Sequence, residues 1–295
     1  MRILFITIFS LILTFSAFAD APNGLAFLKI CTDVRTAAMG EAGVAAGNPA
    51  SASFYNPALL AHTGENGLGF SHHRWIQDIK MNHLFAYFKT GVRVGISALA
   101  TGVNDIEIRS TPSPEPIELT DSYDISVGLH LAYPVTSRFG IGFAAKFLNE
   151  HIYYADTQGF AFDFGASYLI TDRLRVAAAL MNAGQMNELD QVKPYLPWTV
   201  RTGAAYELPL DDWGTLQAAG EVRYIREEDV RGGVGLEWRP RDLIALRGGY
   251  LAGYDERGMT LGLGLYFSHF RLDYAYVPVG DDLGTANRFG LTVVF

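Results

Sequence analysis

The chain has 295 residues, of which 49% are hydrophobic and 18% charged, with a mean hydropathy of +0.12. So much apolar side chain excludes disorder as the main state, and 13% aromatic residues with 31 glycines favour strands over helices. The net charge of −8, without a cluster of Lys and Arg, excludes a nucleic-acid binder. The single cysteine, Cys31, excludes an internal disulfide and a metal site built from several cysteines.

The first residues have the pattern of a secretory signal peptide. A positive start at Arg2 precedes an apolar run over 3–18, and Ala17-Phe18-Ala19 has the small residues of a cleavage site. We therefore expect residues 1–19 to be removed and the mature chain to begin at Asp20. A transmembrane anchor is the alternative, but the run is short for a membrane helix and no basic stop-transfer flank follows it.

From residue 63 onward, apolar and polar residues alternate with a period of two, which is typical of strands with two different faces. Ile125 and Val127 share one face of such a strand, for example, and Asp124 and Ser126 share the other. The predicted strands cover 66–74, 80–89, 92–103, 122–134, 138–152, 158–170, 173–182, 198–208, 214–225, 230–239, 243–252, 258–267, 270–278 and 287–295.

The connections between these strands indicate where the chain resides. Those after even-numbered strands are short, whereas several after odd-numbered strands are longer, namely 104–121, 183–197 and 279–286. Short turns on one rim and long loops on the other are typical of outer-membrane barrels. We therefore predict an all-β fold, a transmembrane antiparallel β-barrel of about 14 strands, with apolar residues facing lipid. The opposite face carries Asp124, Asp163, Arg175, Arg201, Glu221, Arg223, Arg231, Glu237, Arg247, Arg271 and Asp273.

The last strand ends on an aromatic carboxyl terminus. Phe289, Leu291, Val293 and Phe295 alternate with smaller or polar residues. This pattern resembles the terminal signal that the outer-membrane barrel assembly machinery recognises by strand addition. An ordinary last strand is the alternative interpretation.

The stretch before the barrel, residues 20–62, does not alternate. Its central part is rich in Gly and Ala and nearly uncharged, which favours tight packing inside a lumen over exposure to water. Asn56-Pro57 forces an extended residue followed by a turn. The predicted domains are thus this segment and a barrel over 63–295. The inward charges then either line an aqueous pore or pair across the lumen and with Arg35 or Glu41; we prefer pairing.

Within that segment the chain resembles a known family. Arg35, Ala38-Met39-Gly40 and Ala42-Gly43, then Asn48 and Ser53-Phe54-Tyr55-Asn56-Pro57-Ala58, are similar to the N-terminus of the PorV/PorQ family, which is related to FadL-type transporters. The resemblance implies a 14-stranded barrel whose N-terminal segment folds into the lumen as a hatch. The hatch residues that it indicates are Arg35, Gly40, Gly43, Asn48, Asn56 and Pro57.

Two functions follow from the resemblance. PorV/PorQ proteins imply a non-enzymatic component or partner of type IX-like secretion, which binds secretion-system components or cargo proteins. FadL-type proteins imply uptake of hydrophobic compounds such as long-chain fatty acids through a side opening. An apolar pocket beside the hatch with a strand kink near Gly91 or Gly95 would favour uptake. A closed lumen and a flat apolar rim would favour the partner role.

No motif for catalysis or for a cofactor is found in the sequence. It lacks a nucleophile elbow, a phosphate-binding loop and the metalloprotease motif, so we predict no enzyme, no cofactor and no metal. His72 and His73 are adjacent on a predicted strand, so their side chains point to opposite faces and cannot readily share a metal. Gly232-Gly233-Val234-Gly235 lies within a strand pattern, which favours close packing against the hatch over a dinucleotide site.

Overall fold

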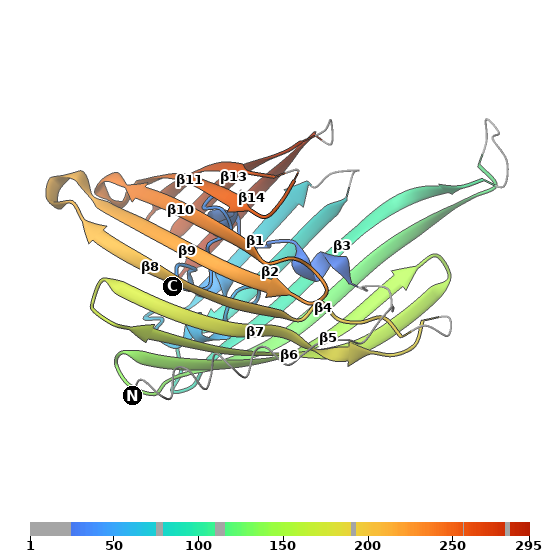
Figure 1. Cartoon of the computed structure of the whole chain (residues 1–295), viewed down its shortest axis with the longest axis horizontal. Coiled ribbons are helices and arrows are strands. Elements are labelled where there is room, and N and C mark those ends of the chain that lie inside the picture. The colour runs from blue at the N-terminus through green and yellow to red at the C-terminus, as the bar shows by residue number, and fades with distance from the viewer. Residues whose placement is uncertain (1–24, 75–78, 110–115, 190–192, 256, 281–283) are drawn as a thin grey trace.

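The computed structural model describes residues 25–74, 79–109, 116–189, 193–255, 257–280 and 284–295. Fourteen antiparallel strands form a closed barrel within this part of the chain (Figure 1). They are β1 (Gly67–Arg74), β2 (Lys80–Phe88), β3 (Arg93–Ile108), β4 (Glu118–Pro134), β5 (Phe139–Ile152), β6 (Ala155–Leu169), β7 (Leu174–Met186), β8 (Thr199–Pro209), β9 (Thr215–Ile225), β10 (Arg231–Arg239), β11 (Ile244–Ala252), β12 (Met259–Phe267), β13 (Phe270–Val279) and β14 (Gly284–Val294).

Each strand pairs with its neighbours in sequence, and β1 closes the barrel against β14, from Gly67 opposite Val294 to Arg74 opposite Asn287. The predicted fold class is confirmed. The expected loop 104–121 is wrong in part, because β3 runs on to Ile108 and β4 begins at Glu118. Alternation is lost there since neither face is buried, so the sequence carries no periodic signal for these strand ends.

The wall of the barrel is of unequal height. β3 and β4 have 16 and 17 residues, whereas β1 and β2 have 8 and 9. The last β3 residue paired with β2 is Gly102, and the first β4 residue paired with β5 is Ser122. Beyond them lie Val103–Ile108 and Glu118–Asp121, which pair with neither β2 nor β5; Val103 pairs with Ser122, and Ile106–Ile108 pair with Glu118–Thr120. We call these two stretches the ribbon; it projects from one end of the barrel (Figure 1).

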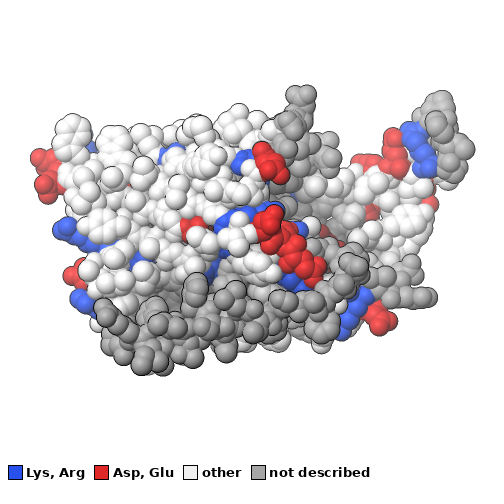
Figure 2. Space-filling model, viewed as in Figure 1, with Lys and Arg blue, Asp and Glu red and all other residues white. Residues whose placement is uncertain are grey.

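The outer surface is apolar along the strands. Side chains such as Val127, Leu129, Phe164 and Leu263 are exposed on it, as alternation predicts for a lipid-facing wall. Much of the left half of the face in Figure 2 is uncharged, and charged side chains lie at its left end, near the middle of the view and at the right. Among the described residues, no helix is both long and apolar enough to cross a membrane.

The N-terminal segment (Leu25–Asn66) lies inside the barrel, where it makes only single helical turns (Figure 1). Most of its side chains are buried, and three clusters join its apolar residues to inward residues of the strands. Three of the four turns are capped by Asp33, Asn48 and Asn56, whose side chains supply backbone N–H groups with acceptors. The turns are η2 (Ala26–Lys29), α2 (Val34–Ala37), η3 (Pro49–Ser51) and η4 (Pro57–Leu60).

Candidate functional site

Glycines on both sides allow the N-terminal segment to lie directly on the wall of β10 and β11. Gly40 adopts the left-handed conformation, with φ of +60°. A Cβ on Gly233 or Gly249 would overlap the backbone of Gly40, and one on Gly235 would overlap the carbonyl of Met39. The interpretation of the glycine cluster as a place of close packing is therefore confirmed, because two backbones meet here with no side chain between them.

A buried ion-pair network joins the segment to the same side of the barrel. Arg35 binds Glu237 through two hydrogen bonds, Nε to Oε2 at 2.8 Å and Nη2 to Oε1 at 2.9 Å. Arg247 also donates to Glu237 from Nε, at 2.6 Å. Arg35 Nη1 donates to the carbonyl of Ala46 at 2.7 Å, so one guanidinium fastens two parts of the segment to β10.

The second part of the network surrounds Glu41. Arg223 binds its Oε2 at 2.7 Å and Arg257 its Oε1 at 3.3 Å. Burial disfavours the charged carboxylate, but these guanidinium groups outweigh burial and lower the pKa of Glu41 to about 2. The structure thus contains the pairing of inward charges with Arg35 and Glu41 that we preferred over an open aqueous pore.

A third anchor is Glu221 on β9. Its Oε2 accepts the backbone N–H groups of Gly43 and Val44 at 2.9 and 2.8 Å. Its Oε1 accepts a hydrogen bond from Arg201 at 2.6 Å. Gly43 itself has no room for a side chain, because a Cβ would lie 2.6 Å from the ring of Tyr55.

Asn56 and Pro57 lie on the opposite side of the lumen, against β5 and β6. Asn56 Oδ1 accepts the N–H of Ala58 at 2.9 Å, and Nδ2 donates to the carbonyls of Val44 and Ala166 at 3.2 Å each. Glycines make the space, since a Cβ on Gly165 would overlap the Asn56 amide. Asn48 has a local role: its side chain caps η3 in a reciprocal pair with Ser51. Whether these six motif residues act as a hatch remains a prediction.

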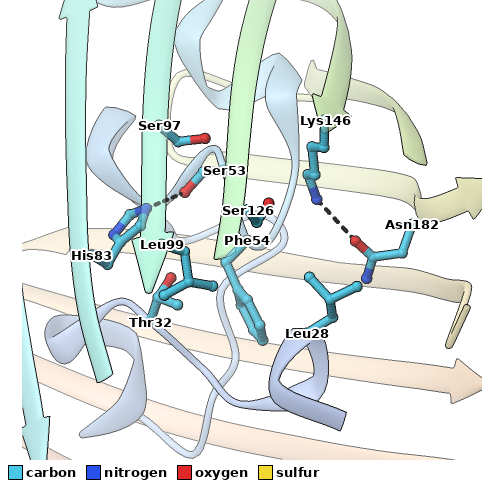
Figure 3. Close-up of a pocket in the computed structure, with 10 residues that line it drawn as sticks. All are labelled: Leu28, Thr32, Ser53, Phe54, His83, Ser97, Leu99, Ser126, Lys146 and Asn182. Carbon is cyan, nitrogen blue, oxygen red and sulfur yellow. Dashed lines mark hydrogen bonds between the residues drawn. The ribbon is translucent and has the colours of Figure 1, made fainter. Parts of the chain in front are cut away.

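The lumen beside β1–β5 contains small cavities that are lined partly by polar side chains. Two cavities of about 20 Å³ each adjoin Thr32 and His83 there. Each has room for only one or two water molecules. Figure 3 shows the first cavity, which is lined by side chains from the segment and from five strands. Ser53 Oγ and His83 Nε2 share a hydrogen bond of 2.9 Å there, and Lys146 donates to Asn182 at 2.9 Å.

The strand kink that would favour uptake is not found in the described wall. Register between β2 and β3 is continuous from Lys80 opposite Gly102 to Phe88 opposite Val94. The space over Gly95 is filled by the ring of Phe85, 2.7 Å from where a Cβ would stand. Gly91 lies outside the strands, in the turn between them.

The histidines behave as the strand periodicity predicts. His73 is buried and hydrogen-bonds the carbonyl of Thr32, whereas His72 lies on the other face and bonds Asn82. Among the described residues, no group of three or more His, Cys, Asp or Glu side chains is placed to hold a metal ion.

Sequence reasoning missed some lumen contacts. Lys146 forms a buried ion pair with Asp163 at 2.7 Å, yet only Asp163 stood out in the pattern. The signal was present, because Lys146 occupies an inward position of its strand and a buried lysine requires a partner. Cys31 is also buried and approaches the Tyr55 hydroxyl at 3.0 Å; burial raises the pKa of this thiol to about 11.

The final strand pairs along its length with β13 and β1. Phe289, Leu291 and Phe295 are exposed on the outer side, and Val293 is half-buried. The N–H of Phe295 donates to the carbonyl of Asn66 at 3.0 Å, which ties the end of the chain to the start of the barrel. The recognition of these residues during assembly stays a prediction.

Solved structures with the same fold include transporters of small hydrocarbons. The Ralstonia pickettii toluene transporter TbuX is 14% identical, with a TM-score of 0.58 over 88% of this chain and 96% of that one. The Pseudomonas putida toluene transporter TodX is 11% identical, with a TM-score of 0.60 over 88% and 95%. The monoaromatic hydrocarbon channel CymD is 12% identical, with a TM-score of 0.56 over 92% and 97%. At these identities the likeness establishes the fold alone.

Sequence comparison establishes the family. No curated protein matches the chain. The family described as "Type IX secretion system protein PorV" matches residues 20–225, which is most of the chain and includes the segment inside the barrel. The predicted resemblance is confirmed, and with it an outer-membrane β-barrel. The chain therefore belongs to the PorV family of type IX secretion system proteins.

Proposed function

We propose that this protein is a non-enzymatic outer-membrane component of type IX-like secretion that binds secretion-system components or exported proteins. The observation that carries the proposal is the filled lumen. Backbone contacts at Gly40, ion pairs at Arg35 and Glu41, and cavities of about 20 Å³ beside Thr32 leave little room in this part of the described lumen. A barrel whose lumen is occupied in this way supports binding of partners at its rims rather than passage of a solute.

The proposal includes export and assembly. A signal peptide ending near Ala19 directs the chain to the periplasm, outside the described residues. Phe289, Leu291, Val293 and Phe295 are the signal read by the barrel assembly machinery. Residues 20–62 then act as the hatch that keeps the barrel impermeable.

The ribbon is the surface we propose for the partner. Its outer edges carry backbone groups that pair with no other strand of the barrel, so they can accept an added strand. Leu119 is exposed on it, and Ile117 is exposed immediately before it. Asp105, Glu107 and Glu118 give it an acidic character, which favours an extended partner segment with basic and apolar residues.

The test is gentle purification from native outer membranes, followed by mass spectrometry of retained polypeptides and lipids. The matched variant replaces residues 104–121 with an Asn-Gly turn between the partners Val103 and Ser122, which leaves the paired barrel strands intact. We expect secretion-system or cargo polypeptides with the natural chain and their loss with the variant. Equal recovery of these polypeptides with both chains would contradict the ribbon as the binding surface. Recovery of no such polypeptide with the natural chain would contradict the secretion role.

Uptake of hydrophobic molecules is the second candidate. An apolar cluster near one end of the lumen favours it, where Leu25 and Leu28 of the segment pack with Leu99, Leu148 and Met186 of the wall. Displacement of the first residues of the segment would open an apolar site. A bound fatty acid or other hydrophobic ligand in the same mass spectra, with no polypeptide partner, would support uptake over secretion.

A further inference from the structure

A row of oxygen-bearing side chains crosses the four strands β3–β6 on the face that points into the lumen. Thr101 on β3 is opposite Asp124 on β4, which is opposite Glu150 on β5, which is opposite Thr157 on β6. Thr101, Glu150 and Thr157 are buried, and Asp124 is half-buried. All four occupy inward positions of their strands, close to where the wall rises toward the ribbon.

Among the described residues, the two carboxylates at the centre of the row have no counter-charge. Side chains directly opposite on antiparallel strands lie roughly 5 Å apart at Cβ, and like charges there are destabilising. Of the residues that the structure describes, Leu25 alone donates a hydrogen bond to Glu150, from its backbone N–H at 3.3 Å. Within the described part of the chain, no side chain forms a hydrogen bond or ion pair with Asp124.

The hydroxyl beside them is an independent sign of a missing ligand. Thr101 is 7% exposed, and its Oγ1 has no hydrogen-bond partner among the described residues. A buried hydroxyl without a partner is costly, so it marks a place where another group is expected. At the other end of the row, the Thr157 hydroxyl donates to the carbonyl of Asn187 at 3.0 Å, which leaves its lone pairs available to a cation.

We propose that Asp124, Glu150 and Thr101 form a binding site for a hard divalent cation, with Thr157 at its edge. Calcium and magnesium take oxygen ligands of this kind and complete their coordination with water, which half-buried Asp124 can admit. The cation would supply the charge that the two carboxylates lack. It would also brace β3, β4, β5 and β6 below the ribbon.

The test measures thermal unfolding and calorimetric binding of the purified full-length protein at pH 8, with Ca²⁺ or Mg²⁺ against EDTA. Asp124→Asn and Glu150→Gln keep the side-chain shape, and Thr101→Val removes the hydroxyl. Asp172→Asn, on an exposed turn of the opposite rim, is the matched control. Circular dichroism verifies that each variant forms a barrel.

We expect one of the two cations to bind the natural chain and the Asp172 variant equally, and at least tenfold more weakly to the Asp124 and Glu150 variants. In EDTA those two variants should melt no lower than the natural chain, because the repulsion between like charges has been removed. A purely structural role for the carboxylates would lower their melting temperature instead. The proposal is overturned if neither cation binds, or if binding is unchanged in the Asp124 and Glu150 variants.

Discussion

Replacement of Gly249 by Ala should displace the N-terminal segment, whereas the same change at Gly248 should not. The two glycines are neighbours on β11 and face opposite sides of the wall. A Cβ on Gly248 would lie 3.9 Å from Leu261 Cδ2, an ordinary contact. A Cβ on Gly249 would overlap backbone atoms of Met39 and Gly40, which cannot rotate away as a side chain can.

The size of the effect follows from this geometry. Overpacking a close-packed interior costs about 1–3 kcal/mol. If that cost destabilises the docked segment, the fraction of molecules in which the segment is displaced rises roughly 5- to 150-fold. Alanine at Gly248 restricts the unfolded chain without a clash and should be neutral or slightly stabilising.

Cys31 provides the assay because it is the single cysteine of the chain and is buried in the segment. Its pKa of about 11, raised by burial, keeps the docked thiol unreactive at neutral pH. We expect a maleimide to label the Gly249→Ala protein at least fivefold faster than the Gly248→Ala protein. Equal rates in two properly formed barrels would refute the reasoning, since the segment would then tolerate a side chain at its closest backbone contact.

Two further predictions concern the same segment. Asn56→Ala should cost about 1–3 kcal/mol, because the buried carbonyls of Val44 and Ala166 lose their donor, and faster labelling of Cys31 would report it. Unchanged labelling would contradict a hatch role for Asn56. For Glu41, the pKa of about 2 is below the ordinary 4.5, so its stabilisation is complete above pH 4.5 and is lost as the pH falls toward 2. Thermal melts from pH 7 to 2.5 should show no loss from this group until below pH 4.5, and an earlier loss that Glu41→Gln abolishes would contradict the assignment.

The barrel could be predicted from sequence because each strand is buried on one side only. Lipid and lumen impose opposite demands on alternate residues, so Ile125 and Asp124 reveal their faces without any structure. The ribbon could not be found in this way, because water surrounds both faces and alternation disappears beyond Gly102.

The site was predictable in kind but not in detail. Small residues and Asn56-Pro57 indicated a packed segment, and inward charges indicated partners for Arg35 and Glu41. Which carboxylate meets which guanidinium depends on the path of an irregular chain, and no periodicity encodes that path. The pairing of Arg35 with Glu237, 202 positions apart, therefore required the fold.

The unequal wall gives the molecule a front and a back. β3 and β4 exceed β1 and β2 by eight residues each, 16 against 8 and 17 against 9. At about 3.4 Å per residue and a tilt of about 40°, this difference corresponds to roughly 20 Å of height. A large molecule lying over the barrel would meet the raised strands β3 and β4 on one side and the low rim at β1 and β2 on the other. Its approach would therefore be directional.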